Sequence, residues 1–123
     1  MTNQELHNLC LDWQERLRVQ DWRVAVSFAV PGQMSETYHH GECATCDARK
    51  LARIKILRPD CHPGDEFEAP YDTEEILVHE LLHLHTNGLN IAPDSAENMA
   101  MEQMVDLVAE ALVRLKRENI TDG

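Results

Sequence analysis

The chain carries a His-Glu-x-x-His pattern at His79-Glu80-Leu81-Leu82-His83, inside an apolar stretch. Residues four apart on a helix lie on one face, so His79 and His83 can bind a single metal ion through two imidazoles. Glu80 is not needed as a ligand and can take a proton from a water at that metal. Because ionisable groups on a buried helix are costly unless something pairs with them, the pattern predicts a metal site. Imidazole and carboxylate ligands favour zinc.

A chance spacing of two histidines on a core helix is the alternative interpretation. Chance matches should fall on loops and exposed helix faces as often as on an apolar face. The apolar positions Val78, Leu81, Leu82 and Leu84 around this pattern therefore favour the metal site.

A catalytic zinc site needs a third protein ligand and an open position for water. His85 lies only two residues beyond His83 and faces elsewhere on the helix. The longer pattern His-Glu-x-x-His-x-x-Gly-x-x-His is not met, because Thr86 and Leu89 stand in place of its glycine and last histidine. The third ligand is therefore expected to be a carboxylate from the final helix.

Glu97 and Glu102 are the two candidates for that carboxylate. Glu97 lies in the first turn, where an acidic residue is explained by the helix dipole. Glu102 lies well inside the helix beside its apolar stripe, and we predict that it is the ligand. Asp106, four residues further on the same face, is predicted to accept a hydrogen bond from the spare ring nitrogen of a ligand histidine. A solvent-exposed acidic helix face is the alternative for both residues.

The elements that must position these side chains can be predicted from hydrophobic periodicity. A capping box from Thr2 to Glu5 opens a helix that runs to about Val19 and packs on one face of a sheet. Alternation predicts strands at 22–30 and 51–57, and a weaker strand at 37–40 broken by Gly41. Residues 59–70 form a loop.

Two further helices complete the predicted order of helix, two or three strands, helix, helix. Asp72 is the predicted N-cap of the helix that carries His79, with Glu75 closing its capping box, and this helix ends at Asn87-Gly88. The last helix starts at 94–97 and frays near Arg117. Its predicted buried stripe is Met101, Met104, Val105, Val108, Leu112 and Leu115. The expected fold class is α+β, with a small, mostly antiparallel sheet.

Length and charge limit the function classes. With 123 residues the chain is expected to form one domain over residues 1–123, and its formal net charge of -11 argues against a nucleic-acid partner. No apolar run approaches the roughly 18 residues of a membrane span, so no membrane partner is expected. The first residues lack the pattern of a signal peptide, so we expect a cytoplasmic protein with reduced cysteines.

The pattern of His79, Glu80 and His83, followed by Glu102 and Asp106, resembles the gluzincin metallopeptidases, the thermolysin-like group. Length and element order are similar to the small minigluzincins and to small His-Glu-x-x-His proteins of bacterial and phage genomes. The resemblance covers about residues 22–115. The chain differs from the larger enzymes in lacking a C-terminal subdomain, and Met101 stands where an asparagine often precedes the ligand glutamate.

This resemblance implies hydrolysis of peptide bonds in a peptide or protein substrate. Zinc would be held by His79, His83 and Glu102, with Glu80 as general base. A further donor would stabilise the developing oxyanion, and the candidates are Tyr38, His39, His40, His62 and Tyr71. An edge strand, either 51–57 or the weaker strand before it, would pair with extended substrate.

The cysteines allow a second metal site. Cys43 and Cys46 form a Cys-x-x-Cys pair, and Cys61-His62 follows 15 residues later. These four residues are candidate ligands of a structural zinc, with His39 or His40 as a replacement for the fourth. A redox pair, a thiol that reaches the catalytic zinc and keeps the protein latent, and unpaired thiols are the alternatives, and Cys10 is expected in the core.

Three functions remain compatible with these patterns. The first is a zinc-dependent endopeptidase, either active as folded or latent until it is processed or bound. The second is a zincin-fold module that binds metal without catalysis within a phage or host complex. The third is a hydrolase that acts on a non-protein amide. An intact Glu80 favours an enzyme, because a structural metal site does not use a general base.

Overall fold

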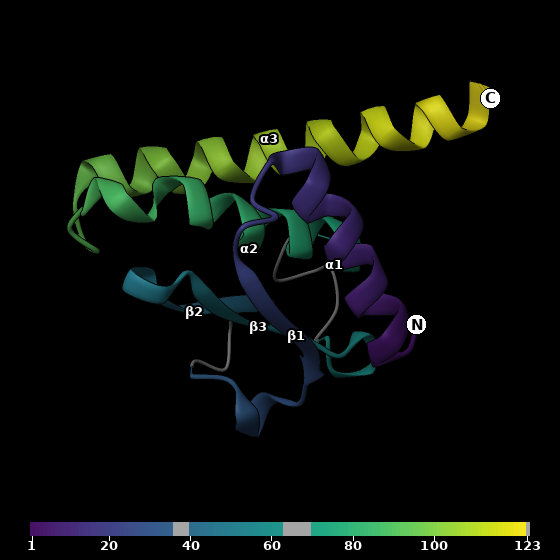
Figure 1. The fold of residues 1–123 in the computed structure, drawn as a ribbon, viewed down its shortest axis with the longest axis horizontal. Helices are drawn as coiled ribbons and strands as arrows, with labels where there is room; N and C mark the ends of the chain where they lie inside the picture. The colour runs from purple at the N-terminus through teal and green to yellow at the C-terminus, as the bar shows by residue number, and fades with distance from the viewer. Residues whose placement is uncertain (36–39, 63–69, 123) are drawn as a thin grey trace.

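The computed structural model describes residues 1–35, 40–62 and 70–122. Its elements follow the order α1 (Asn3–Leu17), β1 (Arg23–Ala29), β2 (Gly41–Cys46), β3 (Leu51–Leu57), α2 (Thr73–Thr86) and α3 (Ala96–Asp122). The sheet forms one layer, α2 lies above it, and α3 runs across the outer side of α2 (Figure 1). The α+β class predicted from the sequence is confirmed.

The first helix forms as its sequence predicts. Thr2 accepts a hydrogen bond from the backbone N–H of Glu5, and the Glu5 carboxylate accepts one from the N–H of Thr2. The buried positions Leu6, Cys10 and Trp13 recur at helical spacing and face the sheet and α2.

The sheet is mixed, so the prediction of a mostly antiparallel sheet is wrong. Its strand order is β1-β3-β2, with β1 parallel to β3 and β2 antiparallel to β3. The parallel pair joins strands that are not consecutive in the chain, and such a crossover carries no local sequence signal. In β3, Ala52, Ile54 and Ile56 are buried and alternate with more exposed residues, as predicted.

The second strand, β2, lies further along the chain than the predicted strand at 37–40. It starts at Gly41 rather than breaking there, and it contains the Cys-x-x-Cys pair; residues 37–39 lie outside the described residues. A Cβ atom on Gly41 would lie 2.6 Å from Ile76 Cγ2 and 3.3 Å from Glu80 Cγ. Glycine therefore allows β2 to approach α2 closely at the position of Glu80.

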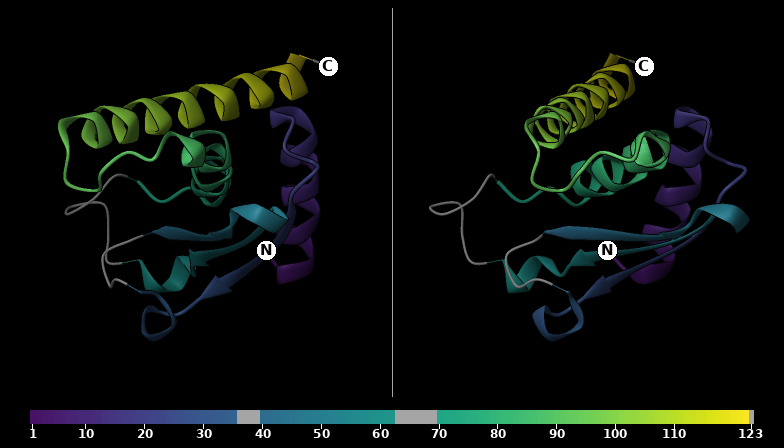
Figure 2. Two further views of the ribbon diagram at one scale, coloured as in Figure 1. Left: turned by 60° about the vertical axis from the view of Figure 1, so that its left-hand side comes forward. Right: turned by 90° about the vertical axis from the view of Figure 1, so that its left-hand side faces the viewer.

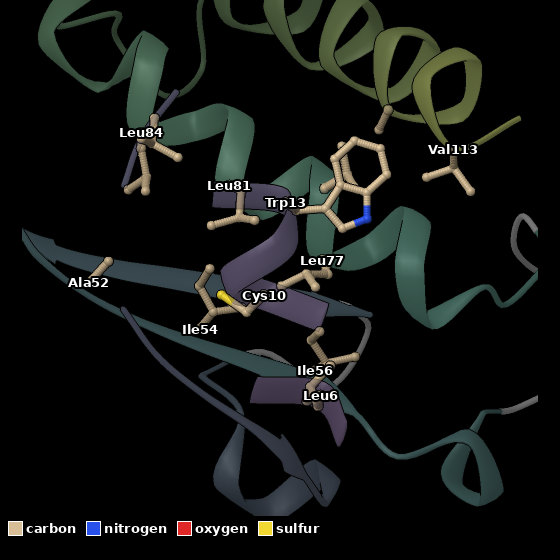
Figure 3. Close-up of a cluster of buried hydrophobic side chains, with 13 residues drawn as sticks. Leu6, Cys10, Trp13, Ala52, Ile54, Ile56, Leu77, Leu81, Leu84 and Val113 are labelled. Carbon is tan, nitrogen blue, oxygen red and sulfur yellow. The ribbon is translucent and has the colours of Figure 1, made fainter. Parts of the chain in front are cut away.

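One hydrophobic cluster joins the sheet to all three helices (Figure 3). Its members include Leu6, Cys10 and Trp13 from α1, Ile54 and Ile56 from β3, Leu77 and Leu81 from α2, and Val113 from α3. The central helix α2 contacts α1, α3, β2 and β3, and Figure 2 shows it enclosed between the sheet and α3. This surrounding support fixes the helix that carries His79 and His83.

Helix α2 begins and ends near its predicted bounds. Asp72 accepts a hydrogen bond from the N–H of Glu75, with a donor–acceptor distance of 3.1 Å. The helix ends at Thr86 and passes into a short 3₁₀ turn, Asn87–Leu89. The end predicted at Asn87-Gly88 is thus within two residues of the observed one, and the left-handed residue after the turn is Asn90, with φ of 56°.

Two predictions for α3 are wrong. The helix continues to Asp122 instead of fraying near Arg117, and its buried face is rotated. Val105, Ala109 and Val113 are buried, whereas Met104, Val108 and Leu115 of the predicted stripe are 50, 37 and 55 % exposed. The face of α3 toward α2 also carries polar side chains with partners on α2, and the apolar pattern alone did not reveal these partners.

No helix in the described ranges is long and apolar enough to cross a membrane.

Candidate metal centre

Helix α2 holds two imidazoles together on the face that looks toward α3. The Nε2 atoms of His79 and His83 lie 3.2 Å apart, and the ring centroids are 5.0 Å apart. The i, i+4 spacing on one helix face produces this proximity. Both side chains are mostly buried, with 19 and 21 % of their surface exposed.

Helix α3 adds the predicted carboxylate. Glu102 Oε2 lies 3.2 Å from His79 Nε2, and Glu102 Oε1 lies 3.2 Å from His83 Nε2. Among the described residues, His79, His83 and Glu102 are the group of His, Cys, Asp and Glu side chains that is placed to hold a metal ion. We call these three residues the metal-ligand cluster.

The spacing of these atoms suits a small tetrahedral ion. Ligand atoms about 2.0–2.1 Å from a tetrahedral zinc lie about 3.3 Å from one another. The three separations of 3.2 Å are close to that value. Two imidazole nitrogens and one carboxylate oxygen also form a common protein ligand set for zinc.

Asp106 lies where the sequence predicted it, against the side of His79 that faces away from the cluster. Its Oδ1 atom is 2.9 Å from His79 Nδ1. A carboxylate only accepts hydrogen bonds, so Nδ1 donates to Asp106, and whenever the ring is neutral this leaves its lone pair on Nε2, toward the cluster. Burial lowers the pKa of His83, while the charge of Glu102 acts in the opposite direction, and the net effect favours the neutral ring that a metal requires.

Glu80 is the buried carboxylate beside this cluster. It is 7 % exposed, and it makes no hydrogen bond within the ranges that the structure describes. The pKa of Glu80 is raised to about 7, mainly by burial. The charge of His79 acts to lower this pKa, and the negative charges of Glu102 and Glu42 act to raise it. A carboxylate with this basicity is suited to accept and return a proton near neutral pH.

An open cleft of about 1020 Å³ gives access to the site. Its walls come from β2, α2 and α3, and the metal-ligand cluster, Glu80 and Asp106 all line it. Gly41 and Glu42 on β2 line the same cleft. Such a cleft is large enough to admit an extended segment of peptide.

The five candidate oxyanion donors have different locations. His40 lines the cleft. His62 packs against His40 and Tyr71, with ring centroids 4.8 and 5.5 Å away. The Tyr71 hydroxyl donates a hydrogen bond to the carbonyl of Leu57 at 2.6 Å. Tyr38 and His39 lie outside the described residues.

The cysteine site proposed from the sequence does not form. Cys43 and Cys46 are three residues apart on β2, so their side chains leave opposite faces of the sheet. Cys46 is next to the first residue of β3 and Cys61 follows its last, which separates them by roughly 20 Å along the strand. Cys43, Cys46, Cys61 and His62 therefore do not share one ion, and all four cysteines are free thiols.

The side chain of Cys43 faces inward and lines the cleft beside Glu80. Burial raises the pKa of its thiol to about 12, with a further contribution from the charge of Glu80. This thiol is therefore neutral near pH 7, and a redox role for the Cys-x-x-Cys pair has no support, because a short 3₁₀ turn and not an α-helix follows Cys46.

Sequence reasoning missed three residues that shape the cleft. Gly41 was interpreted as a strand breaker, although it permits the contact between β2 and α2. Glu75 and Glu110 line the cleft as well. Their signal was present in the spacing, since Glu75 lies four residues before His79 and Glu110 four residues after Asp106.

Comparison of the chain with protein-family models, curated proteins and solved structures finds no match in any of the three. The functional interpretation therefore depends on the residues and the geometry of the site.

Proposed function

We propose that the protein is a zinc-dependent metallopeptidase of the gluzincin type, in which His79, His83 and Glu102 bind the metal and Glu80 is the general base. The convergence of these three ligands within 3.2 Å, beside a buried carboxylate in an open cleft, is the observation that supports the proposal. The position of Asp106 adds to it, because the hydrogen bond to His79 orients the imidazole for metal binding.

A zinc ion bound here would supply Lewis acidity, since zinc lowers the pKa of a water ligand toward about 7 and polarises a carbonyl group. Glu80 would hold the proton removed from the attacking water on its carboxylate and then deliver it to the leaving amine. Asp106 would keep the His79 ring in one tautomer throughout. His40, on the wall of the cleft, is the described candidate for a donor to the developing oxyanion.

A cleavage assay with Glu80→Gln tests this function. The wild-type protein, loaded with one equivalent of zinc, is incubated with casein or a mixed peptide library, and new amino termini are measured. Loss of the general base should lower the cleavage rate by about 10²- to 10⁴-fold while zinc binding is retained. Glu97→Gln is the matched control, since it removes one carboxylate from the first turn of α3 without touching the site. Equal cleavage by wild type and Glu80→Gln would contradict the proposal.

A metal-binding interaction module without catalysis is the second candidate. The exposed apolar side chains of α3 favour it, because such faces often mark contact surfaces; they are Met104, Leu107, Val108 and Leu115. This function predicts one bound zinc with no cleavage of any peptide. The zinc-loaded wild-type assay therefore separates the two candidates.

A further inference from the structure

Helix α3 exposes an apolar surface on the side that faces away from α2. Five of the nine large hydrophobic side chains that are exposed in the described part of the chain lie on this helix. The remaining four are scattered over separate segments, as single exposed hydrophobic residues usually are; they are Met1, Leu11, Val30 and Leu89. A concentration of apolar side chains on one helix is different, because such surfaces mark contacts with another molecule.

The apolar residues of this surface have the spacing of a coiled-coil seam. They follow one another at intervals of three, four, three and four positions, namely Met101, Met104, Val108, Ala111 and Leu115. We call these five residues the α3 stripe. This alternation keeps apolar side chains on the side of a helix that packs against a second helix. The buried residues that face α2 occupy other positions, which are Val105, Ala109 and Val113.

No described element covers the α3 stripe. Helix α3 packs on α2, and its outer side is free of other elements (Figure 2). None of the five residues of the stripe lines the cleft. The stripe is therefore separate from the metal-ligand cluster, and the proposed peptidase reaction does not use it.

The side chains of the stripe fit a second copy of the same helix that runs in the opposite direction. With the twofold axis near position 106, Met101 lies opposite Ala111 of the second copy, and Met104 lies opposite Val108. Each large side chain then meets a smaller one, and the symmetry repeats each contact. A parallel pair would place every residue opposite itself, so Ala111 would meet Ala111 and leave a gap in the seam.

Charges at the two ends of the stripe favour the same direction. Glu97 lies in the first turn of α3 and makes no ion pair within the described ranges. Arg114, near the other end, pairs with Glu110 on its own helix, but 69 % of its side chain is exposed. In the antiparallel register Glu97 of one copy lies beside Arg114 of the other, whereas a parallel register would bring like charges together.

We infer that the protein forms a twofold-symmetric dimer in which the α3 stripes of two copies pack against one another in antiparallel orientation. The inference holds whether or not the metal-ligand cluster is catalytic, because the stripe contributes nothing to that cluster. The seam is only about 21 Å long, from position 101 to position 115. Stable interfaces are larger, so the dimer should dissociate in the micromolar range.

Sedimentation equilibrium of the full chain tests the dimer, with a chelator present so that metal does not contribute. The formal net charge of -11 on each copy opposes association. The measurement is therefore made at about 0.15 M salt, where charges more than about 8 Å apart are largely screened. The mass should rise from that of a monomer to that of a dimer as the concentration increases. A protein that stays monomeric at its highest soluble concentration would overturn the inference.

Glutamate substitutions locate the interface. Leu115→Glu and Val108→Glu each place a charge in the seam and should raise the dissociation constant by about tenfold or more. Leu11→Glu on α1 is the matched control for Leu115→Glu, because the two leucines are 52 and 55 % exposed and the change is the same. This control should dimerise like the wild type. An unchanged dissociation constant in both stripe variants, with the fold verified by circular dichroism, would overturn the inference.

Charge reversal tests the direction of the two helices. Glu97→Arg or Arg114→Glu alone creates two like-charge contacts in the antiparallel dimer and should raise the dissociation constant by about three- to tenfold. Both substitutions in one chain restore opposite charges and should recover most of the loss. In a parallel dimer neither single variant would change the affinity, because each position would still meet its own charge. Single variants that dimerise like the wild type would therefore overturn the antiparallel arrangement.

Discussion

Two polar clusters join α2 to α3, and only one of them contains its own cations. Near the start of α2, Glu74 lies 2.6 Å from Lys116 and Asp72 lies 2.8 Å from Arg117, and Trp13 also donates to Glu74. We call this group the ion-pair cluster. The second cluster, the metal-ligand cluster, lies about two turns further along α2. There Glu102 of α3 pairs with His79 and His83, which are charged only when protonated.

The difference explains how each cluster can be tolerated. In the ion-pair cluster, burial alone would raise the pKa of Glu74, but Lys116 and Trp13 hydrogen bonds and nearby positive charge outweigh it and lower that pKa. In the metal-ligand cluster, two imidazoles and one carboxylate lie together without a Lys or Arg partner in the ion pairs of Glu102. The first cluster is balanced by the chain's own cations, whereas the second has the composition of a group that could hold a metal ion.

The largest expected effect comes from breaking the ion-pair cluster. Lys116→Met leaves Glu74, which is 13 % exposed, without its main partner, and it should lower the free energy of unfolding by about 2–4 kcal/mol. Urea denaturation in the presence of a chelator measures this change. The double variant Glu74→Gln with Lys116→Met should recover most of the loss, because neither charge is then unpaired. A loss below about 1 kcal/mol in Lys116→Met would show that the pair does not stabilise the seam.

Gly41→Ala should disturb the metal-ligand side of the molecule and not the ion-pair cluster. The new Cβ would lie 2.6 Å from Ile76 Cγ2, so β2 or α2 must shift beside Glu80. Overpacking of this kind costs about 1–3 kcal/mol, measured by thermal or urea unfolding. Gly32→Ala is the control, because nothing lies within 4 Å of its Cβ position. If the two alanine variants were equally stable, the close approach of β2 to α2 would be wrong.

Asp106→Asn should weaken zinc binding without much effect on the metal-free protein. The carboxylate is 75 % exposed and acts through His79, so its main contribution is to orient that ring. Loss of such a partner lowers metal affinity by about 10- to 100-fold, which competition with a chromophoric chelator can measure. Glu97→Gln on the same helix should bind zinc like the wild type. An unchanged affinity in Asp106→Asn would remove Asp106 from the site.

The stabilisation of the fold by the ion-pair cluster and by zinc at the metal-ligand cluster should be lost in different pH ranges. The pKa values of Asp72 and Glu74 are lowered in the folded protein, so their stabilisation is present above about pH 4 and is lost as pH falls further. Zinc binding requires neutral imidazoles, whose ordinary pKa is about 6.5, so the stabilisation by zinc should fade between about pH 7 and 5. Melting temperatures with zinc and with chelator, recorded from pH 8 to 3.5, should converge before the protein unfolds. A zinc effect that persists to pH 4 would argue against histidine ligands.

The two histidines of the candidate site were predictable because their information is local. The spacing of His79 and His83 places two nitrogens on one helix face, and the same period relates Glu102 to Asp106. In β3 the alternation of Ala52, Ile54 and Ile56 with Leu51, Arg53, Lys55 and Leu57 predicted the strand.

The rest depends on contacts between distant parts of the chain. The parallel pairing of β1 with β3 has no local signal, and the short polar strand β2 lacks a clear alternation. The buried face of α3 is oriented by Glu102 and Lys116, whose partners lie on α2, and the apolar residues alone predicted a different face. The prediction of a cysteine metal site is wrong because spacing in the sequence does not show at which end of a strand, or on which face of the sheet, a side chain lies.

Zinc content and affinity test the central claim most directly. The protein is purified without a histidine tag or added metal, and zinc per chain is measured by mass spectrometry and titration for the wild type, Glu102→Gln and Cys43→Ser. We predict one zinc per chain in the wild type and in Cys43→Ser, and an affinity lowered by about a hundredfold or more in Glu102→Gln. A wild-type protein that binds no zinc, or a Glu102→Gln variant that binds it equally well, would contradict the account.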